Sequence, residues 1–197
     1  MSTKTEVYDS VFVLMVNESI KYIFSKNLDK KAQKKEIEEL GFQLGEKVSN
    51  HLLNQGISKI NTEKNSIESY INFVAKEVFE FIFRVKSYNV EKENDGSNYI
   101  ITTKDMKLYN ILITEKESQN NPKLEAILNF VCGVIKGALN IFNVECIVVP
   151  NVGKESKSSG KDIKTFPEYQ NIFSFNVNVF SDNKDLGNDS WNNLNIY

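Results

Sequence analysis

The chain has 197 residues, with 24 Lys and Arg against 26 Asp and Glu, so its formal net charge is −2 at pH 7. This charge gives no electrostatic reason to expect a nucleic-acid partner, and the length suits one domain with a substantial core. No apolar run approaches the roughly 18 residues that cross a bilayer, and the polar first residues do not resemble a secretory signal. Cys132 and Cys146 stand in apolar segments, which favours buried free thiols over a disulfide.

The first 56 residues predict two helices. A helix over 8–24 carries apolar residues around most of its circumference, which indicates that it packs on its own core on one side and on a partner chain on the other. A polar connection over 27–35 contains a basic run, and a second helix then extends to about Gln55. Its apolar residues fall at three- and four-residue steps and form one seam, and Gly56 is placed as its C-terminal stop.

A third helix and a β-hairpin follow. The helix runs over about 66–85, with Asn65 or Ser66 as its cap. It contains four phenylalanines that favour core and interface packing, namely Phe73, Phe79, Phe81 and Phe83. Alternation of apolar and polar residues around an Asp95–Gly96 turn signal then predicts the hairpin. The short apolar run over 108–113 is compatible with a strand or with irregular structure.

The last third of the chain predicts a helix and two strands. Pro122 opens the fourth helix, which we expect to end near Asn143. Strands over 144–149 and 172–180 flank a Ser/Lys/Gly-rich loop over 153–167. The order of elements predicts one α+β domain over 1–181, in which four main helices pack on a twisted antiparallel sheet. The Asn-rich segment 182–197 has few apolar residues, and we expect it to be disordered.

Two pairs of glycines inside helices are the most informative local feature. Gly41 and Gly45 are four residues apart in the second helix, and Gly133 and Gly137 repeat this spacing in the fourth. A glycine inside a helix costs roughly 1 kcal/mol relative to alanine. Residues four apart lie on one face, so the missing side chains indicate that another backbone comes close at each pair.

No pattern in the chain is typical of a catalytic, metal or cofactor site. His51 is the only histidine, and no nucleophile motif or metal-ligand spacing accompanies it. The loop from Gly153 to Lys161 is rich in Gly, Ser and Lys, but it lacks the residue order of a phosphate-binding loop. We therefore expect no catalytic residues, no metal and no cofactor, and a role in packing and assembly.

Three segments resemble the small subunits of the TRAPP (transport protein particle) complex, the vesicle-tethering assembly of the secretory pathway. They are ELGFQLGEKVSNHLL (39–53), YINFVAKEVFEFIF (70–83) and LNFVCGVIKGALNIFNVECIVV (128–149). The third segment is most similar to the subunit-6 branch of the Bet-three family, and the subunit-5 branch stays open. The resemblance covers about residues 8–181. It implies the α/β plait fold of these subunits and a non-catalytic, structural role.

The resemblance also implies partners and a place in the cell. We expect a heterodimer with a Bet-three-like subunit, contacts with other TRAPP subunits, and an indirect link through the complex to a Rab-type GTPase. The isolated chain is also compatible with a homodimer. The expected location is cytoplasmic and peripheral at ER and Golgi membranes, through the complex. The expected partner-binding residues lie on the first two helices, namely Val11, Phe12, Met15, Gly41, Leu44, Gly45 and Val48.

Two further expectations concern ligands. The Bet-three subunit carries an acylated cysteine shortly after the glycine-containing helix, whereas residues 57–60 here contain no cysteine, so no fatty-acyl thioester is expected. The alternative function is a sensor that binds haem or a small apolar ligand in a related fold. That alternative requires a buried histidine in an open pocket. An enzyme is the third hypothesis, and the absence of a catalytic motif argues against it.

Overall fold

The computed structural model describes residues 3–56, 66–85, 88–93, 96–104, 106, 121–156 and 169–180. For 3–10, 154–156 and 169–171, the structure describes only the backbone. The elements in chain order are α1 (Thr3–Ser25), α2 (Lys30–Asn54), α3 (Ile67–Phe73), the π-helical segment η2 (Val74–Val78), α4 (Phe79–Phe83), β1 (Tyr88–Lys92), β2 (Asn98–Lys104), α6 (Pro122–Asn140), β3 (Cys146–Ser156) and β4 (Tyr169–Val179).

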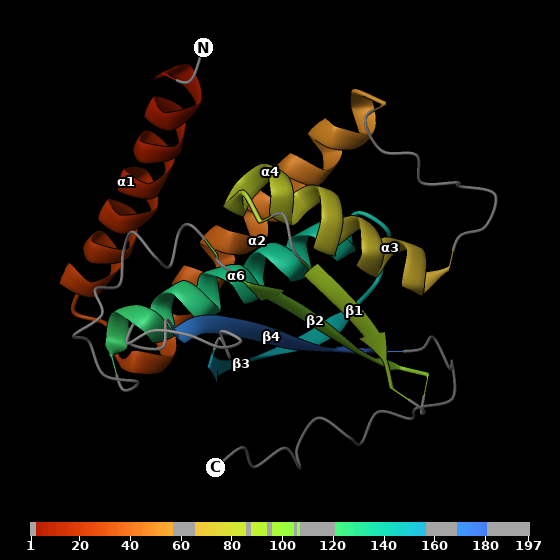
Figure 1. The fold of residues 1–197 in the computed structure, drawn as a ribbon. Helices are drawn as coiled ribbons and strands as arrows, with labels where there is room; N and C mark the ends of the chain where they lie inside the picture. The colour runs from red at the N-terminus through yellow and green to blue at the C-terminus, as the bar shows by residue number, and fades with distance from the viewer. Residues whose placement is uncertain are drawn as a thin grey trace, which may run out of the picture.

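The described strands form one antiparallel sheet with the order β1-β2-β4-β3, and the helices lie over one of its faces (Figure 1). The register of the strands sets buried residues opposite each other across the sheet. Ile101 of β2 pairs with Phe175 of β4, and Val148 of β3 pairs with Val177 of β4. α6 packs on the sheet, and α2 packs on α6. This arrangement confirms the predicted α+β fold with helices on an antiparallel sheet.

The glycine pairs are the contact between α2 and α6. A Cβ added to Gly41 would overlap the backbone carbonyl oxygen of Phe130, and one added to Gly45 would overlap that of Val134. The contact is reciprocal, because Gly133 and Gly137 lie in the same way against the carbonyl groups of two α2 residues, Glu38 and Phe42. The prediction of a close backbone at each pair is confirmed, and each pair meets the backbone of the helix that carries the other pair.

The second helix begins earlier than predicted. The basic run after Asp29 was expected in a connection, but it forms the first turns of α2, which starts at Lys30. The Asp29 side chain accepts a hydrogen bond from the backbone N–H of Ala32 at 2.7 Å, and Lys, Ala and Gln are good helix formers. The predicted end is confirmed, since Gln55 is the C-cap and Gly56 follows with a φ of +63°.

The third predicted helix is one continuous rod with a π-helical turn in its middle. It begins after Ser66, whose hydroxyl accepts a hydrogen bond from the N–H of Ser69 at 3.2 Å. It ends at Arg84, which has a φ of 55°. Three of its four phenylalanines are buried, and Phe79 packs edge-on against Phe83 with a ring-centroid distance of 5.3 Å. Phe81 is exposed.

The last two strands are longer than predicted. β3 continues to Ser156 and takes up the first four residues of the loop expected over 153–167, because it pairs with β4 along its whole length, up to the pair of Ser156 with Tyr169. This pairing satisfies backbone groups in a polar stretch that carries no strand pattern of its own. The predictions for 108–113, for 157–167 and for the tail over 182–197 lie outside the described residues.

Candidate protein–protein interface

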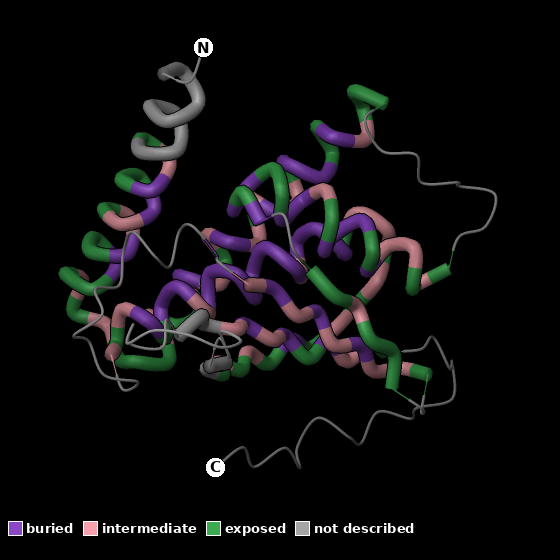
Figure 2. Tube along the Cα trace, viewed as in Figure 1, coloured by how far each residue is buried: buried purple, intermediate pink, exposed green. Residues whose placement is uncertain are grey.

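α1 stands apart from the helices that cover the sheet (Figure 1). Its buried residues recur at three- and four-residue steps and face the rest of the molecule, whereas the opposite side is exposed (Figure 2). The buried set is Val13, Val16, Ile20 and Ile23. The prediction that this helix is apolar on more than one side is therefore confirmed, and one of those sides has no cover among the described residues.

The exposed side of α1 carries large apolar side chains. Val11 is 51% exposed, Met15 is 65% exposed and Tyr22 is 66% exposed. These three residues are spaced by four and seven positions, so they form one stripe along the helix. Leu14, which is 58% exposed, lies beside this stripe at three residues from Val11. Adjacent exposed apolar side chains of this kind are typical of an interaction surface, whereas single ones are normal.

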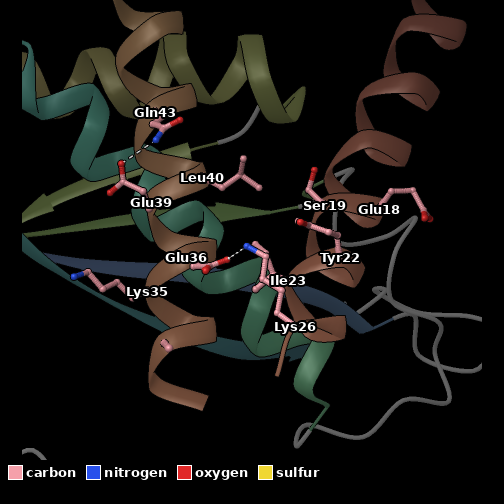
Figure 3. A pocket seen from close by; sticks show the side chains of 11 residues that line it. Glu18, Ser19, Tyr22, Ile23, Lys26, Lys35, Glu36, Glu39, Leu40 and Gln43 are labelled. Atoms are coloured by element: carbon pink, nitrogen blue, oxygen red, sulfur yellow. Dashed lines mark hydrogen bonds and ion pairs between the residues drawn. The ribbon is translucent and has the colours of Figure 1, made fainter. Parts of the chain in front are cut away.

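The stripe leads into an open groove between α1 and α2 with a volume of about 770 Å³. Figure 3 shows Ser19, Tyr22 and Ile23 reaching from α1 towards α2, with Leu40 on the opposite wall. Apolar surface on both walls is flanked by charged side chains. The lining residues are Glu18, Ser19, Tyr22, Ile23, Lys26, Ala32, Lys35, Glu36, Glu39, Leu40 and Gln43. We call the stripe and this groove together the α1–α2 face.

One ion pair joins the two walls of the groove. Lys26 Nζ lies 2.6 Å from Glu36 Oε2, and it also lies 4.9 Å from the centroid of the Tyr22 ring. The hydrogen bond to Glu36 raises the pKa of Lys26 above its ordinary value. The pair is partly solvated, and such pairs contribute little to stability. The pair joins the C-terminal end of α1 to α2 across the groove.

The structure divides the seven residues that the sequence assigned to partner binding. Val11 and Met15 are exposed, and Phe12 and Leu44 are half-buried. The other three, Gly41, Gly45 and Val48, are buried. The two glycines are covered by α6 of the same chain. The role given to these two glycines is therefore corrected: their missing side chains serve a contact within the chain, because α6 occupies that face of α2.

Sequence analysis did not select Leu14, Tyr22 or Leu40, which also contribute to this surface. The spacing of Tyr22 from Met15 and Val11 was a usable signal, because it continues the same side of the helix. Leu40 carried no distinguishing signal, since it belongs to the same three- and four-residue pattern as the buried residues of α2. Only the position of α1 beside α2 shows that Leu40 lines the groove.

The chemically reactive side chains lie elsewhere. His51 is an exposed residue whose ring centroid is 6.0 Å from that of Phe81. Within the described part of the chain, no three His, Cys, Asp or Glu side chains gather as metal ligands would. Cys132 and Cys146 are free thiols. Burial raises the pKa of Cys132 from its ordinary value of 9.0 to about 12 and that of Cys146 to about 11.

We expect both thiols to be unreactive in the native protein. Only the thiolate attacks a disulfide reagent, so native protein near pH 8 should react with Ellman's reagent at least roughly 100-fold more slowly than protein in guanidinium chloride. The pKa of Cys132 is higher in the folded chain than in the unfolded chain. The stability that the buried, protonated thiol of Cys132 contributes is therefore complete below about pH 9 and is lost as the pH rises towards about 12. Cys132→Ala should flatten that alkaline decline. Rapid labelling of native protein would contradict the assignment of a buried Cys132 thiol.

Comparison with known proteins identifies the class of this fold. Residues 12–166 match the family described as "Transport protein particle (TRAPP) component". The crystal structure of a trafficking protein particle complex subunit 3 from Naegleria fowleri, covalently bound to palmitic acid, has the same fold. Its TM-score is 0.63 at 15% sequence identity, over 89% of this chain and 97% of that chain. No curated protein matches the sequence.

The fold and the matched span define a small α+β subunit of a trafficking complex. The chain belongs to the TRAPP component family. This result confirms the family to which the three sequence segments pointed. Among the described helices, none is both long and apolar enough to cross a membrane.

Proposed function

We propose that this chain is a non-catalytic structural subunit of a TRAPP-like vesicle-tethering complex, of the subunit-6 branch. In this proposal it forms a heterodimer with a Bet-three-like subunit through the α1–α2 face. The heterodimer helps to scaffold the assembly that activates a Rab-type GTPase in ER-to-Golgi and Golgi trafficking. The chain would reach these membranes as a peripheral part of the complex, on their cytoplasmic side.

The observation that carries the proposal is the exposed apolar stripe on α1. Val11, Met15 and Tyr22 are each more than half exposed, although they belong to a helix whose other side is buried. Burying apolar area contributes about 25 cal/mol per Å², and a stable interface of ordinary size buries about 800 Å² on each partner. A helix from a second subunit laid along the stripe and the groove would cover these side chains, which supports a four-helix contact.

The distribution of polar chemistry supports a structural role. The groove contains Lys26 and Glu36 already paired with each other. His51 and the two cysteines do not line it. The histidine and the two cysteines therefore do not converge on the groove, whose ionisable lining residues are glutamates and lysines. A catalytic site needs such convergence of a nucleophile, a base and a stabilising group.

The test is to mix the purified chain with the Bet-three-like subunit of the same organism. We expect one complex with the mass of a heterodimer, by size-exclusion chromatography with light scattering. If the isolated chain is a homodimer, its conversion into the heterodimer on mixing is compatible with the proposal. A chain that stays monomeric in the presence of that subunit would refute it. Parallel mixtures with the other small subunits would test the choice of branch, because the subunit-6 and subunit-5 types should compete for one partner surface.

A further inference from the structure

The sheet carries an exposed apolar patch on the face that the described helices do not cover (Figure 1). Ile147 and Val149 of β3 are 39% and 49% exposed, and Phe180, directly after β4, is 50% exposed. Alternation along each strand explains the exposure, because the neighbouring Val148 and Val179 are buried in the core under the helices. We call Ile147, Val149 and Phe180 the sheet patch.

The three side chains of the sheet patch are neighbours. Ile147 pairs with Asn178 of β4, which is two residues before Phe180. The N–H of Phe180 donates a hydrogen bond to the carbonyl oxygen of Glu145 at 3.0 Å, so Phe180 and Ile147 are diagonal neighbours. The uncovered face of an antiparallel sheet is normally polar, and β3 is also an edge strand, where exposed apolar side chains favour association. The sheet patch is therefore a surface that a contact would bury.

The size of the sheet patch favours a tethered segment over a separate protein. Even an aromatic side chain buries only about 150–250 Å², and these three side chains are at most half exposed. Together they supply less than half of the roughly 800 Å² that each partner of a stable complex buries. A segment of the same chain needs less contact area, because tethering raises its effective concentration at the patch.

Residues 181–197 continue the chain directly from the sheet patch. Four of their five apolar residues lie within 191–197, namely Trp191, Leu194, Ile196 and Tyr197. The ten residues before Trp191 can span up to about 33 Å. Val149 lies level with Asn176, which is four residues, or about 13 Å, back along β4 from Phe180. The ten-residue spacer is therefore long enough for the chain to turn back onto the patch.

The charge of 191–197 also suits this surface. The charged residues of 181–197 all lie within 181–190, and the non-apolar residues of 191–197 are three asparagines. Around the sheet patch, the same face of the sheet presents Asn151, Asn176 and Asn178. Side-chain amides both donate and accept hydrogen bonds. An uncharged segment that combines apolar and amide side chains therefore matches an apolar patch bordered by amides.

We propose that residues 191–197 dock on the sheet patch of the same molecule, where Trp191 and the apolar side chains after it cover the patch. Tethering gives an effective concentration in the millimolar range, so even a contact with a Kd of about 1 mM keeps about half of the molecules docked. The docked segment shields an exposed sheet edge from other chains. In this proposal, only residues 182–190 keep the disorder expected from composition. The contact uses no residue of the α1–α2 face, so it does not depend on the proposed heterodimer.

Fluorescence of the full chain tests the proposal, because Trp191 is the only tryptophan. We expect emission at a shorter wavelength, and weaker quenching by acrylamide, than in the same chain unfolded in urea. The double variant Ile147→Asp, Val149→Asp would set two charges against apolar side chains, so the docking equilibrium should shift at least about tenfold towards release. Emission and quenching of this variant should then approach those of the unfolded chain, while circular dichroism shows that the sheet is intact.

A second double variant, Phe81→Asp, Tyr88→Asp, is the matched control. It places the same charges at exposed aromatic positions outside the sheet patch, and it should leave Trp191 shielded. Equal release of Trp191 in the two double variants would overturn the proposal. If Ile147→Asp, Val149→Asp does not fold, Ile147→Thr, Val149→Thr keeps β-branched side chains that favour a strand, and it should still release Trp191 in part.

Other occupants of the sheet patch give different results. If only a separate protein covers it, Trp191 of the isolated chain is as accessible to acrylamide as in urea, which contradicts the proposal. Shielding that grows with protein concentration places the segment on a second copy, and this result also contradicts it. Pairing with the Bet-three-like subunit, measured on the same variants, should be unchanged. Loss of docking and failure of the proposed heterodimer are therefore distinguishable.

Discussion

Gly45→Ala is expected to lower the free energy of unfolding by roughly 3–5 kcal/mol, a large part of the 5–15 kcal/mol typical of a folded domain. Alanine normally favours a helix over glycine by about 1 kcal/mol. Here the added methyl group would overlap the carbonyl oxygen of Val134, which is backbone and cannot rotate away. The two helices would have to separate, and the reciprocal contacts of Gly133 and Gly137 would be lost with them.

Denaturation in urea, followed by circular dichroism, measures this effect. Gly153→Ala is the matched control, because a Cβ at this position meets only the Cβ of Ile172 at 4.0 Å. It should change stability by less than about 1 kcal/mol. Gly45→Leu should fail to fold. A Gly45→Ala protein with unchanged stability would mean that α2 and α6 do not approach as closely as the structure shows.

Met15→Glu is expected to weaken pairing with the Bet-three-like subunit by at least about 30-fold, which corresponds to about 2 kcal/mol. The glutamate would place a charge in an apolar contact without a partner, and desolvation of that charge opposes binding. The stability of the isolated chain should stay within about 0.5 kcal/mol, because Met15 is 65% exposed. Isothermal titration with the purified subunit measures the affinity, and urea denaturation of the isolated variant measures the stability.

Ile147→Glu serves as the control for this substitution. Ile147 is an exposed apolar residue on β3, away from the α1–α2 face, and is 39% exposed. This variant should bind the partner with the affinity of the unchanged chain. If Ile147→Glu abolishes pairing while Met15→Glu does not, the interface lies on the sheet edge and the α1–α2 face has another role. Together with Gly45→Ala, these variants separate loss of folding from loss of pairing.

Local signals predicted the elements of the fold well. Ser66 was one of two predicted caps for the third helix, and its hydroxyl does accept a hydrogen bond from the N–H of Ser69. Pro122 begins α6, and Gly56 follows the end of α2 with a positive φ. These features depend on a few neighbouring residues, so sequence spacing contains the information. The start of α2 was missed because the capping role of Asp29 was not recognised, and a run of lysines was interpreted as a connection.

The candidate interface was predicted in part. The exposed side of α1 followed from its apolar residues, since a helix that is apolar all round has more side chains than its core can cover. Val11 and Met15 are exposed as that reasoning requires. Leu44 and Val48 were selected from the seam of α2, which mixes residues that face α6 with residues that face the groove. Periodicity defines a face of a helix, but it does not say which neighbour covers that face.

By itself, the sequence determined the order and type of the described helices and strands, that two glycine pairs each meet another backbone, and to which family the chain belongs. Only the tertiary structure decided that each glycine pair meets the helix that carries the other pair. The same contact brings Lys136 into an ion pair with Glu38, 98 residues earlier in the chain. Pairing with β4 likewise extends β3 into a stretch without a strand pattern. The physical reason is that such contacts join residues far apart in the chain, and their geometry depends on how the helices and strands pack as whole bodies.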